Sequence, residues 1–477
     1  MTDLPPDAAL VGDLLARVAA EAADLDACLR DLPVARPGGA RDIRERLAKY
    51  DFAAPRPAEE VLDDVASLLR RFNVHVTHPR YFGLFNPSVV PAAVAAEALA
   101  AAVNPQLAVW SHAPAANEIE RHTLRALTRC VGFDADTAAA HFTTGGMESN
   151  LTAVVAALAH RFPEFREGGL RALPGQPVLY VSEEGHHSFA KAAQVTGLGQ
   201  AAARRLPVGD DLRLDPATLH RAIAEDRAAG RIPFLVAATA GTTGAGVIDP
   251  LPEIADLCAE ERLWFHVDAA WGGGALLSPA WRHVLAGVER ADSVTWDAHK
   301  WLSVPFAAGM FFCRHRDALL AAFDVASGYM PEPREGCDDF HRVTLQWTRR
   351  TLGLKVFAAL AACGLSGYAS MIDRQTALGA ALRERLVAAG WRLVNATPLP
   401  VVCFTHAEIA AGRVTAKKVA QHVVHAGRAW ISPVKLSGRP PCLRACITSW
   451  RTTEADLDVL VASLAEALGG AASTISS

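Results

Sequence analysis

The spacing of apolar side chains predicts a helical segment at the beginning of the chain. Residues 7–31 and 59–73 both carry apolar positions at helical intervals, and a polar connector containing proline and glycine separates them. The apolar stripe of the second segment consists of Val61, Leu62, Val65, Leu68 and Leu69. Because two helices bury little apolar surface alone, we expect residues 1–80 to form a helical N-terminal arm that packs against another domain or a partner subunit.

From about residue 135 the pattern changes to short apolar runs that alternate with amphipathic segments. The runs that we predict to be strands are residues 177–182, 234–240, 263–269, 292–296 and 309–314. Alternating strands and helices are typical of an α/β domain, in which helices cover both faces of a parallel sheet. We therefore assign residues 81–365 to a large α/β domain with a mostly parallel sheet.

The C-terminal part of the chain shows fewer strands. A helical stretch around residues 349–388 is followed by two strand-containing runs, 391–405 and 443–450. A final helix follows, for which Thr453 is the expected N-cap. This pattern predicts a smaller α+β domain over residues 366–477.

The composition is that of an ordinary globular protein and excludes several classes of function. The chain has 477 residues, of which 51% are hydrophobic and 21% charged, and its formal net charge is −4. At about 150 residues per domain, this length corresponds to two or three domains. There is no basic block to attract nucleic acid or an anionic membrane surface, and no apolar run of about 18 residues predicts a membrane span. Nine dispersed cysteines without a CxxC pair indicate reduced thiols, so we expect a cytoplasmic protein.

Polar residues gather where the predicted strands end, and ligands of parallel sheets bind beyond these carboxyl ends. In the stretch 141–150, Gly145, Gly146 and Met147 precede a helix that starts near Glu148. Glycines let backbone N–H groups approach a ligand closely, and the N-terminus of a helix favours an anion. The stretch is therefore a candidate phosphate site, although the same sequence is also compatible with a simple turn.

Two further strand ends carry groups that suit a cofactor. Asp268 lies near the end of the run 263–269, and Thr239 lies near the end of the run 234–240. An aspartate in such a place is either a cap or turn residue, or a carboxylate that pairs with a cation in the crevice of the sheet. Hydroxyl-rich turns, such as the one after Thr239, are also common for structural reasons alone.

Lys300 stands in the stretch DSVTWDAHKWLSVP, just beyond the strand predicted at 292–296. Desolvation disfavours the charged form of lysine, and the free amine is the nucleophile that Schiff-base chemistry with a carbonyl requires. Asp268 is one strand–helix–strand step away, so we expect both side chains at the same edge of the sheet. A phosphate site, a carboxylate and a lysine amine are together what pyridoxal phosphate needs. His186, which follows the strand 177–182, could stack on its ring.

These residues together resemble the group II family of pyridoxal-phosphate-dependent decarboxylases, which includes the aromatic-amino-acid, glutamate, histidine, cysteine-sulfinate and diaminobutyrate decarboxylases. The resemblance covers residues 60–460. Its most specific parts are the stretches DAHKWL, HVDAAWGG and RRTLGLKVF, and the stretches HPRYFGLF, APAANEIE, GHHS and LRACIT support it. It implies an α/β fold like that of aspartate aminotransferase (fold type I), pyridoxal 5'-phosphate as the cofactor, and a homodimer.

The resemblance also implies roles for single residues around the cofactor. Lys300 corresponds to the lysine that binds the cofactor aldehyde, and Asp268 to the partner of the pyridine nitrogen. Ala270 corresponds to the small residue under the ring, and His186 to the histidine that stacks on it. The remaining positions, on the phosphate side or near the cofactor, are Gly145, Gly146, Met147, His299 and Thr239.

The resemblance has a further implication at each of two positions. The family frequently has a serine where this chain has Met147, so backbone N–H groups or another hydroxyl must hold more of the phosphate. Tyr329, in the polar loop YMPEPREGCDDFH, corresponds to the tyrosine of a mobile loop that protonates the substrate carbon after CO2 has left.

The predicted function is that of a carboxy-lyase, which converts an L-amino acid into an amine and CO2. An aldehyde synthase or an aminotransferase on the same scaffold is the first alternative, and an inactive homologue that binds the cofactor is the second. The substrate pocket implied by the resemblance contains Tyr81, Phe82, Phe85 and Trp110, which favours an aromatic or apolar substrate. Arg80 could instead pair with an acidic one. We expect no metal and no nucleic-acid or membrane partner.

Overall fold

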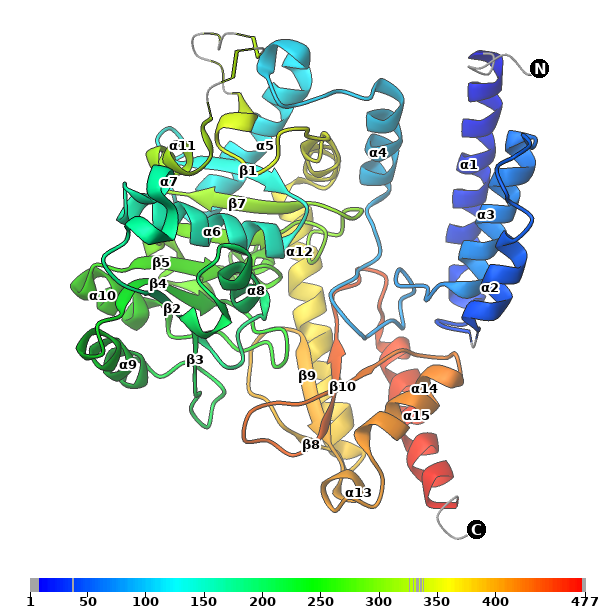
Figure 1. Cartoon of the computed structure of the whole chain (residues 1–477). Coiled ribbons are helices and arrows are strands. Elements are labelled where there is room, and N and C mark those ends of the chain that lie inside the picture. The colour runs from blue at the N-terminus through cyan, green and yellow to red at the C-terminus, as the bar shows by residue number, and fades with distance from the viewer. Residues whose placement is uncertain are drawn as a thin grey trace.

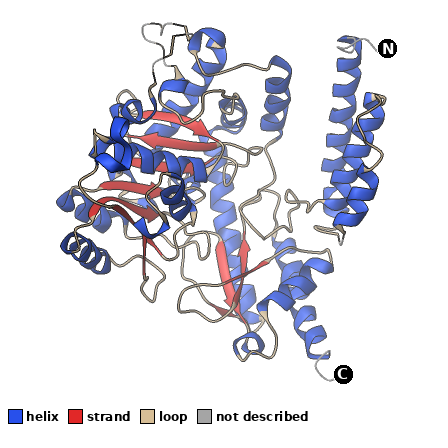
Figure 2. Cartoon of the chain, viewed as in Figure 1, coloured by secondary structure: helices blue, strands red, loops and turns tan. Residues whose placement is uncertain are grey.

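The chain is built around two β-sheets of different size, which one long helix connects (Figures 1 and 2). The computed structural model describes residues 8–36, 38–325, 327–328, 330–331, 334, 337 and 339–473. Figure 2 shows the strands in two separate groups, with most helices around the larger group.

The larger sheet has seven strands in the order β1-β7-β6-β5-β4-β2-β3. They are β1 (Ala139–Thr143), β2 (Pro177–Ser182), β3 (Ala203–Leu206), β4 (Ile232–Thr239), β5 (Trp264–Asp268), β6 (Ser293–Asp297) and β7 (Gly309–Cys313). β7 runs antiparallel to β1 and β6, and the other six strands of this sheet are parallel to one another. The predicted mostly parallel sheet is therefore confirmed.

Helices cover both faces of this sheet, which explains why its strands are apolar without alternation. In β2, Val178 and Tyr180 belong to one core, whereas Leu179 and Val181 belong to the other. The first core is closed by α5 (Pro114–Val131), α9 (Pro216–Ala228) and α10 (Leu251–Glu261). The second is closed by α6 (Gly146–Arg161), α8 (Ser188–Val195) and α11 (Arg316–Phe323), and α7 (Phe165–Gly168) lies beside α6.

The smaller sheet is antiparallel, in the order β10-β11-β9-β8. Its strands are β8 (Arg392–Leu393), β9 (Val401–Thr405), β10 (Ser432–Val434) and β11 (Cys442–Cys446). It packs with α14 (Ala416–His425) and α15 (Glu454–Ser473), and α13 (Ala407–Ala410) follows β9. Thr453 directly precedes α15, and its N–H and hydroxyl donate to Asp456 at 2.9 and 2.8 Å. β10 was not predicted, because three residues around Pro433 give no readable alternation.

The first three helices form an arm that stands apart from the large sheet (Figure 1). They are α1 (Ala8–Cys28), α2 (Ala40–Leu47) and α3 (Ala58–Phe72). Ion pairs such as Arg17–Asp63, at 2.8 Å, join α1 to α3, and Arg30 joins the arm to Asp456 of the small domain at 3.1 Å. α2 lies in the predicted connector. Its sequence, ARDIRERL, has too few apolar residues for a periodic stripe.

The helix α12 (Gly353–Ala388) connects the two sheets and packs against α5, α15 and α4 (Pro91–Val103). Gly364 breaks it with φ 67° and ψ 164°, next to the domain boundary that we predicted at residue 365. Among the described helices, α12 alone is long and apolar enough to cross a membrane by length and composition. It nevertheless carries the buried polar side chains of Lys355 and Gln375 and contributes Ile372 and Leu382 to the two cores that it joins.

Candidate active site

The carboxyl ends of the parallel strands bring most of the predicted cofactor residues to one edge of the large sheet. Asp268 ends β5 and lies opposite Thr239, the last residue of β4, in the parallel ladder. Lys300 follows β6 by three residues. The N–H of Asp297, at the end of β6, donates to the carbonyl of Ala270 at 2.7 Å. The strand register therefore places the carboxylate, the hydroxyl and the lysine at the same edge of the sheet, as expected from the sequence.

Lys300 forms an ion pair with Asp297, a residue that the sequence analysis had not singled out. Its Nζ lies 3.0 Å from Oδ2 of Asp297, which is 1% exposed, whereas the lysine side chain is 24% exposed. The same carboxylate oxygen accepts the N–H of Gly146 at 3.2 Å. In this structure the lysine is thus not an isolated buried amine. Asp297 was detectable as an acidic residue at a strand end, one helical turn before the lysine.

Asp268 is held by a hydrogen bond to each of its carboxylate oxygens. Oδ2 accepts a side-chain N–H of Asn150 at 2.8 Å, and Oδ1 accepts the backbone N–H of Ala270 at 3.1 Å. The residue is 4% exposed. Hydrogen bonds to both oxygens fix the direction of a carboxylate. Asp268 can therefore present an oriented carboxylate to a partner at this edge of the sheet.

His186 lies in the loop between β2 and α8, with its ring held by the first residue of that helix. Its Nδ1 accepts the N–H of Ser188 at 3.2 Å, so the proton of the neutral ring is on Nε2. Burial lowers the pKa of His186, and the nearby carboxylate of Asp268 opposes this shift. Lys300 and Asp297 also act on this imidazole. His186 thus belongs to the same charged cluster as the lysine.

The turn that we predict to hold the phosphate consists of Gly145 and Gly146, directly before and at the start of α6. Gly145 has φ 153°, and a Cβ on Gly146 would lie 3.0 Å from Oδ2 of Asp297 and 3.5 Å from Cβ of Ala270. The side chain of Met147 instead packs against the core that α6 closes. His299 borders this turn, accepts the N–H of Ala308 through Nδ1 at 3.1 Å, and has a pKa lowered by burial. The two glycines carry no side chain that would cover this turn, while the N–H of Gly146 is held by Asp297 and the N–H groups of Glu148 and Ser149 donate to the carbonyl of Gly145 at 3.0 and 3.2 Å.

Thr239 is fixed by its backbone and leaves its hydroxyl without a partner among the described residues. Its N–H donates to Oδ2 of Asp249 at 2.7 Å, and Oδ1 of Asp249 accepts the N–H of Leu214 at 2.8 Å. Burial raises the pKa of Asp249 to about 6. The orphaned Thr239 hydroxyl and the equally orphaned Oδ1 of Asp297 are both buried at this edge of the sheet, where a polar ligand would satisfy them.

These residues fit pyridoxal phosphate. The Gly145–Gly146 turn would hold the phosphate, Asp268 the pyridine nitrogen, and Lys300 the aldehyde, while Ala270 and His186 would lie against the ring. When bound, this cofactor supplies an electron sink for a bond broken at the α-carbon of an amino acid.

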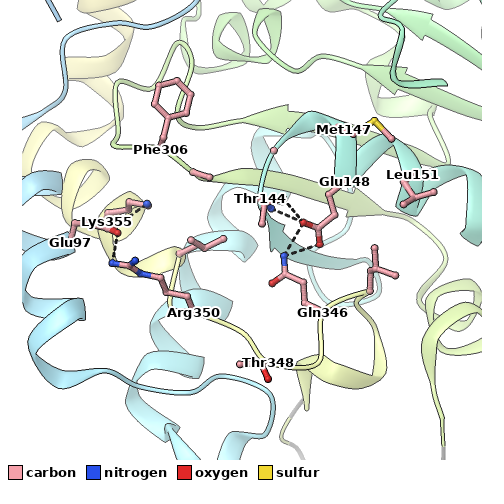
Figure 3. Close-up of a pocket in the computed structure, with 14 residues that line it drawn as sticks. Glu97, Thr144, Met147, Glu148, Leu151, Phe306, Gln346, Thr348, Arg350 and Lys355 are labelled. Carbon is pink, nitrogen blue, oxygen red and sulfur yellow. Dashed lines mark hydrogen bonds and ion pairs between the residues drawn. The ribbon is translucent and has the colours of Figure 1, made fainter. Parts of the chain in front are cut away.

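A cavity of about 770 Å³ opens beside the phosphate turn (Figure 3). On one wall, Glu148 accepts hydrogen bonds from Thr144 and Gln346; on the other, Glu97 pairs with Arg350 at 2.7 Å and Lys355 at 3.0 Å. The ring of Phe306 points away from both walls and is exposed.

The residues predicted to form the substrate pocket do not all face an open space. Phe82 is fully buried in the small-domain core, which corrects our expectation for this residue, because its side chain fills that core. Phe85 stacks on Trp271 at 4.5 Å between ring centroids, and Tyr81 lies 5.2 Å from Trp430. Trp110 donates its indole N–H to Glu118 at 2.8 Å. Tyr329 lies outside the described residues.

Arg444 is a second residue that the sequence analysis did not assign. It lies on β11 and is 5% exposed. Its guanidinium donates to the carbonyl of Thr243, to the carbonyl of Gly83 at 3.1 Å and to the hydroxyl of Ser432 at 3.2 Å, while Nε has no partner in the described chain. The sequence indicates this residue by a charged side chain placed between leucine and alanine within a predicted strand.

Comparisons with known proteins agree with this geometry. The sequence profile of the pyridoxal-dependent decarboxylase conserved domain matches residues 44–407. L-aspartate decarboxylase dtxS4 of Metarhizium robertsii is 32% identical over 364 residues, which are 75% of this chain and 72% of the relative. The crystal structure of mouse CSAD superimposes with a TM-score of 0.90 at 29% identity, over 97% of this chain and 99% of the other. The structure of Oryza sativa TDC with PLP and tryptamine gives 0.90 at 25% identity, over 98% and 99%.

The predicted fold, cofactor and reaction class are confirmed by these findings. The structural neighbours have fold type I, and one of them carries the cofactor in its crystal structure. The chain therefore belongs to the family of pyridoxal-dependent decarboxylases and is a pyridoxal-phosphate-dependent carboxy-lyase acting on amino acids.

Proposed function

We propose that this enzyme decarboxylates a small acidic L-amino acid of the size of aspartate. The observation that carries this proposal is the buried guanidinium of Arg444, which donates to carbonyl and hydroxyl oxygens and pairs with no carboxylate of the described chain. A buried charge without a counter-ion costs several kcal/mol, so an anionic group of the substrate would stabilise it. Aspartate is also the substrate in the name of the fungal relative.

The thiols around Arg444 are uncharged, and Glu184, whose charge acts on Cys403 and Cys442, accepts the N–H of Ser437 and forms no ion pair with the guanidinium. Burial raises the pKa of Cys403, Cys442 and Cys446, so these neighbours carry no charge near neutral pH. The ring of Phe85 lies 5.9 Å from the guanidinium and is itself stacked on Trp271. The aromatic side chains of this region are therefore already engaged with one another, which speaks against the aromatic or apolar substrate that the sequence favoured.

Catalysis would be best served if Arg444 bound the side-chain acid rather than the carboxylate that leaves. An ion pair on the leaving carboxylate stabilises the ground state more than the transition state, in which that charge flows into the cofactor. An ion pair on the side-chain acid is the same in both states and serves to orient the substrate.

We assign the remaining roles to residues at this edge of the sheet and to Tyr329, which lies outside the described residues. Lys300 would hold the cofactor aldehyde until the substrate amine replaces it, and Asp268 would hold the pyridine nitrogen. The bound cofactor would supply the electron sink for the bond between the α-carbon and the departing CO2. His186 or Tyr329 would donate one proton to the α-carbon, and Lys300 would take back the cofactor as the amine leaves. The balance is one amino acid to one amine and one CO2, without an oxidant.

We also propose that the enzyme is a homodimer that closes the cavity beside the phosphate turn. α4 carries Glu97 into this cavity and leaves Val94, Leu99 and Val103 exposed. Exposed apolar groups of this kind are typical of a subunit interface. Sedimentation of the wild type and of Leu99→Asp tests this, and a wild type that sediments as a monomer contradicts it.

The substrate proposal is tested by measuring CO2 release from aspartate, glutamate, cysteine sulfinate, tryptophan and tyrosine. We expect kcat/KM to be highest for an acidic substrate and Arg444→Met to raise the KM for it by about 100-fold, from the roughly 3 kcal/mol of a charged hydrogen-bonded pair. Arg444→Lys should restore part of this loss. Preferred turnover of tryptophan or tyrosine by the wild type, or equal losses for all substrates in Arg444→Met with normal cofactor absorbance, contradicts the proposal.

A further inference from the structure

Asn150 occupies the centre of a buried polar cluster beneath the cofactor crevice. One of its side-chain N–H groups donates to Oδ2 of Asp268 at 2.8 Å, and the other donates to the hydroxyl of Ser188 at 2.8 Å. The backbone N–H of the same serine holds Nδ1 of His186. A single amide therefore contacts both the carboxylate assigned to the pyridine nitrogen and the residue that orients the stacking histidine.

The side-chain oxygen of Asn150 also has two hydrogen-bond partners. Oδ1 accepts the hydroxyl of Thr295 at 2.7 Å and faces Nε2 of His266 at 3.1 Å. An asparagine amide can donate twice and accept twice, so its hydrogen-bonding capacity is filled. An inverted amide would direct its oxygen at the carboxylate of Asp268, so charge as well as geometry fixes the orientation of this side chain.

The proton on His266 can be placed by following the next contacts. The indole N–H of Trp264 donates to the hydroxyl of Ser293 at 2.9 Å, and this hydroxyl lies 2.8 Å from Nδ1 of His266. The serine proton is therefore available to Nδ1, which leaves the imidazole proton on Nε2, directed at Asn150. Burial lowers the pKa of His266 to about 4, so the ring stays neutral near neutral pH and keeps this arrangement.

We propose that Asn150 is a positioning residue that couples Asp268 to His186, and that His266 locks its amide in the productive orientation. Neither side chain is exposed, at 1% for Asn150 and 0% for His266, and the rings of Phe189 and Phe311 lie beside His266 at 5.8 and 6.4 Å between centroids. Both side chains act on the cofactor residues through hydrogen bonds: Asn150 bonds Asp268 and Ser188, and His266 bonds Asn150. The cluster fixes the direction of the carboxylate and the tilt of the imidazole together, so both would present the same geometry to the ring of the cofactor.

The test measures cofactor binding to the full chain without an amino-acid substrate, so its outcome is independent of the substrate class. The variants are Asn150→Asp, which places a second carboxylate beside Asp268, and His266→Phe, which keeps the ring and removes both hydrogen bonds. His266→Gln is the conservative variant, because it retains an N–H near the position of Nε2. Tyr180→Phe is the matched control. It removes one buried hydrogen bond, which the Tyr180 hydroxyl on β2 donates to Asp226 at 2.8 Å, and does not touch the cluster.

Two readouts are taken for each variant: the dissociation constant of pyridoxal phosphate and the visible circular dichroism of the bound cofactor, which reports how the ring is held. We expect Asn150→Asp and His266→Phe to weaken binding by about tenfold or more and to change the dichroism. Asn150→Asp loses the hydrogen bond to the charged Asp268, and His266→Phe frees the amide of Asn150 to leave that bond. His266→Gln and Tyr180→Phe should remain close to the wild type. The proposal is overturned if His266→Phe and Asn150→Asp match Tyr180→Phe in both readouts. If Asn150→Asp does not fold, the comparison of His266→Phe with His266→Gln decides.

Discussion

Nζ of Lys300 lies 3.0 Å from Oδ2 of Asp297, and this oxygen also accepts the N–H of Gly146. One carboxylate thus joins the end of β6 to the first residue of α6 and holds the lysine beside the phosphate turn. Because the lysine, the turn and the carboxylate share this contact, the covalent and the phosphate ends of the cofactor site are fixed relative to each other.

This relationship predicts which lysine carries the cofactor. Borohydride reduction of the holoprotein followed by peptide mapping should find the tag on Lys300, since it is the lysine placed at the carboxyl edge of the sheet. Lys300→Ala should lose both turnover and the visible absorbance of the bound cofactor. Lys355 is the control, because it also pairs with a carboxylate, that of Glu97, but lies on the cavity wall in α12 and not beyond a parallel strand. A tag on Lys355 or on any other lysine would refute the assignment.

Tyr329→Phe should lower amine formation by about 100-fold, which is the lower end of the effect of a positioned general acid. The unprotonated carbon left by CO2 would then react with dissolved oxygen, which acts as the two-electron oxidant, so aldehyde should appear together with ammonia and hydrogen peroxide. Amine and aldehyde are measured together. Tyr50→Phe is the control, because it removes the same hydroxyl from a tyrosine of the N-terminal arm, where that group bonds Asp64. Undiminished amine formation by Tyr329→Phe would leave His186 as the proton donor.

Glu120 and Arg349 form a fully buried ion pair at 2.7 Å. Removing one charge of this pair should reduce stability far more than removing one charge of an exposed pair. Glu120→Gln should reduce the free energy of unfolding by about 3–5 kcal/mol, because it leaves the guanidinium buried without a counter-charge. The exposed pair Arg41–Glu45 provides the control, and Glu45→Gln should change stability by about 0.5 kcal/mol or less. Chemical denaturation of the cofactor-free protein measures both. Similar losses in the two variants would contradict this account.

Asp249 predicts a specific dependence of stability on pH. Its pKa is about 6 in the folded chain and 3.8 in the reference state, so the folded chain binds the proton more tightly. This contribution is fully present below about pH 4 and is lost as pH rises through 6, by roughly 3 kcal/mol at 1.36 kcal/mol per unit. In Asp249→Asn this pH-dependent part should vanish. Parallel stability–pH curves of variant and wild type between pH 4 and 7 would show that Asp249 does not titrate in this range.

The sequence predicted five of the seven strands of the large sheet, without β1 and β3, and the residues at the strand ends because their signals are local. Asp268, Thr239 and Lys300 each follow an apolar run, and the rule that parallel strands share a carboxyl edge brings them together. Asn150 and Asp297 were missed for the opposite reason. A polar residue in the first turn of a helix or at a strand end has the same local pattern whether it faces water or a buried carboxylate, and only the packing of α6 on β5 and β6 distinguishes the two.

The substrate side was harder to predict for a related physical reason. An apolar residue such as Phe82 or Phe85 gives the same sequence pattern when it lines a pocket as when it fills a core, and the structure places Phe82 in a core. Arg444 was hidden in a short strand whose neighbours are apolar. The residues that contact Arg444 come from segments far apart in the chain, so no local sequence pattern predicts these contacts.

Arg444 contacts Gly83 and Thr243, which precede it by 361 and 201 residues. The strands that carry the predicted cofactor residues are therefore all synthesised before β11, but the anchor proposed for the substrate exists only once the last hundred residues have folded back onto the first. A partially synthesised or C-terminally clipped molecule could then capture the vitamin-derived cofactor without gaining the means to select an amino acid, which would make loss of substrate discrimination an early sign of damage at the C-terminus.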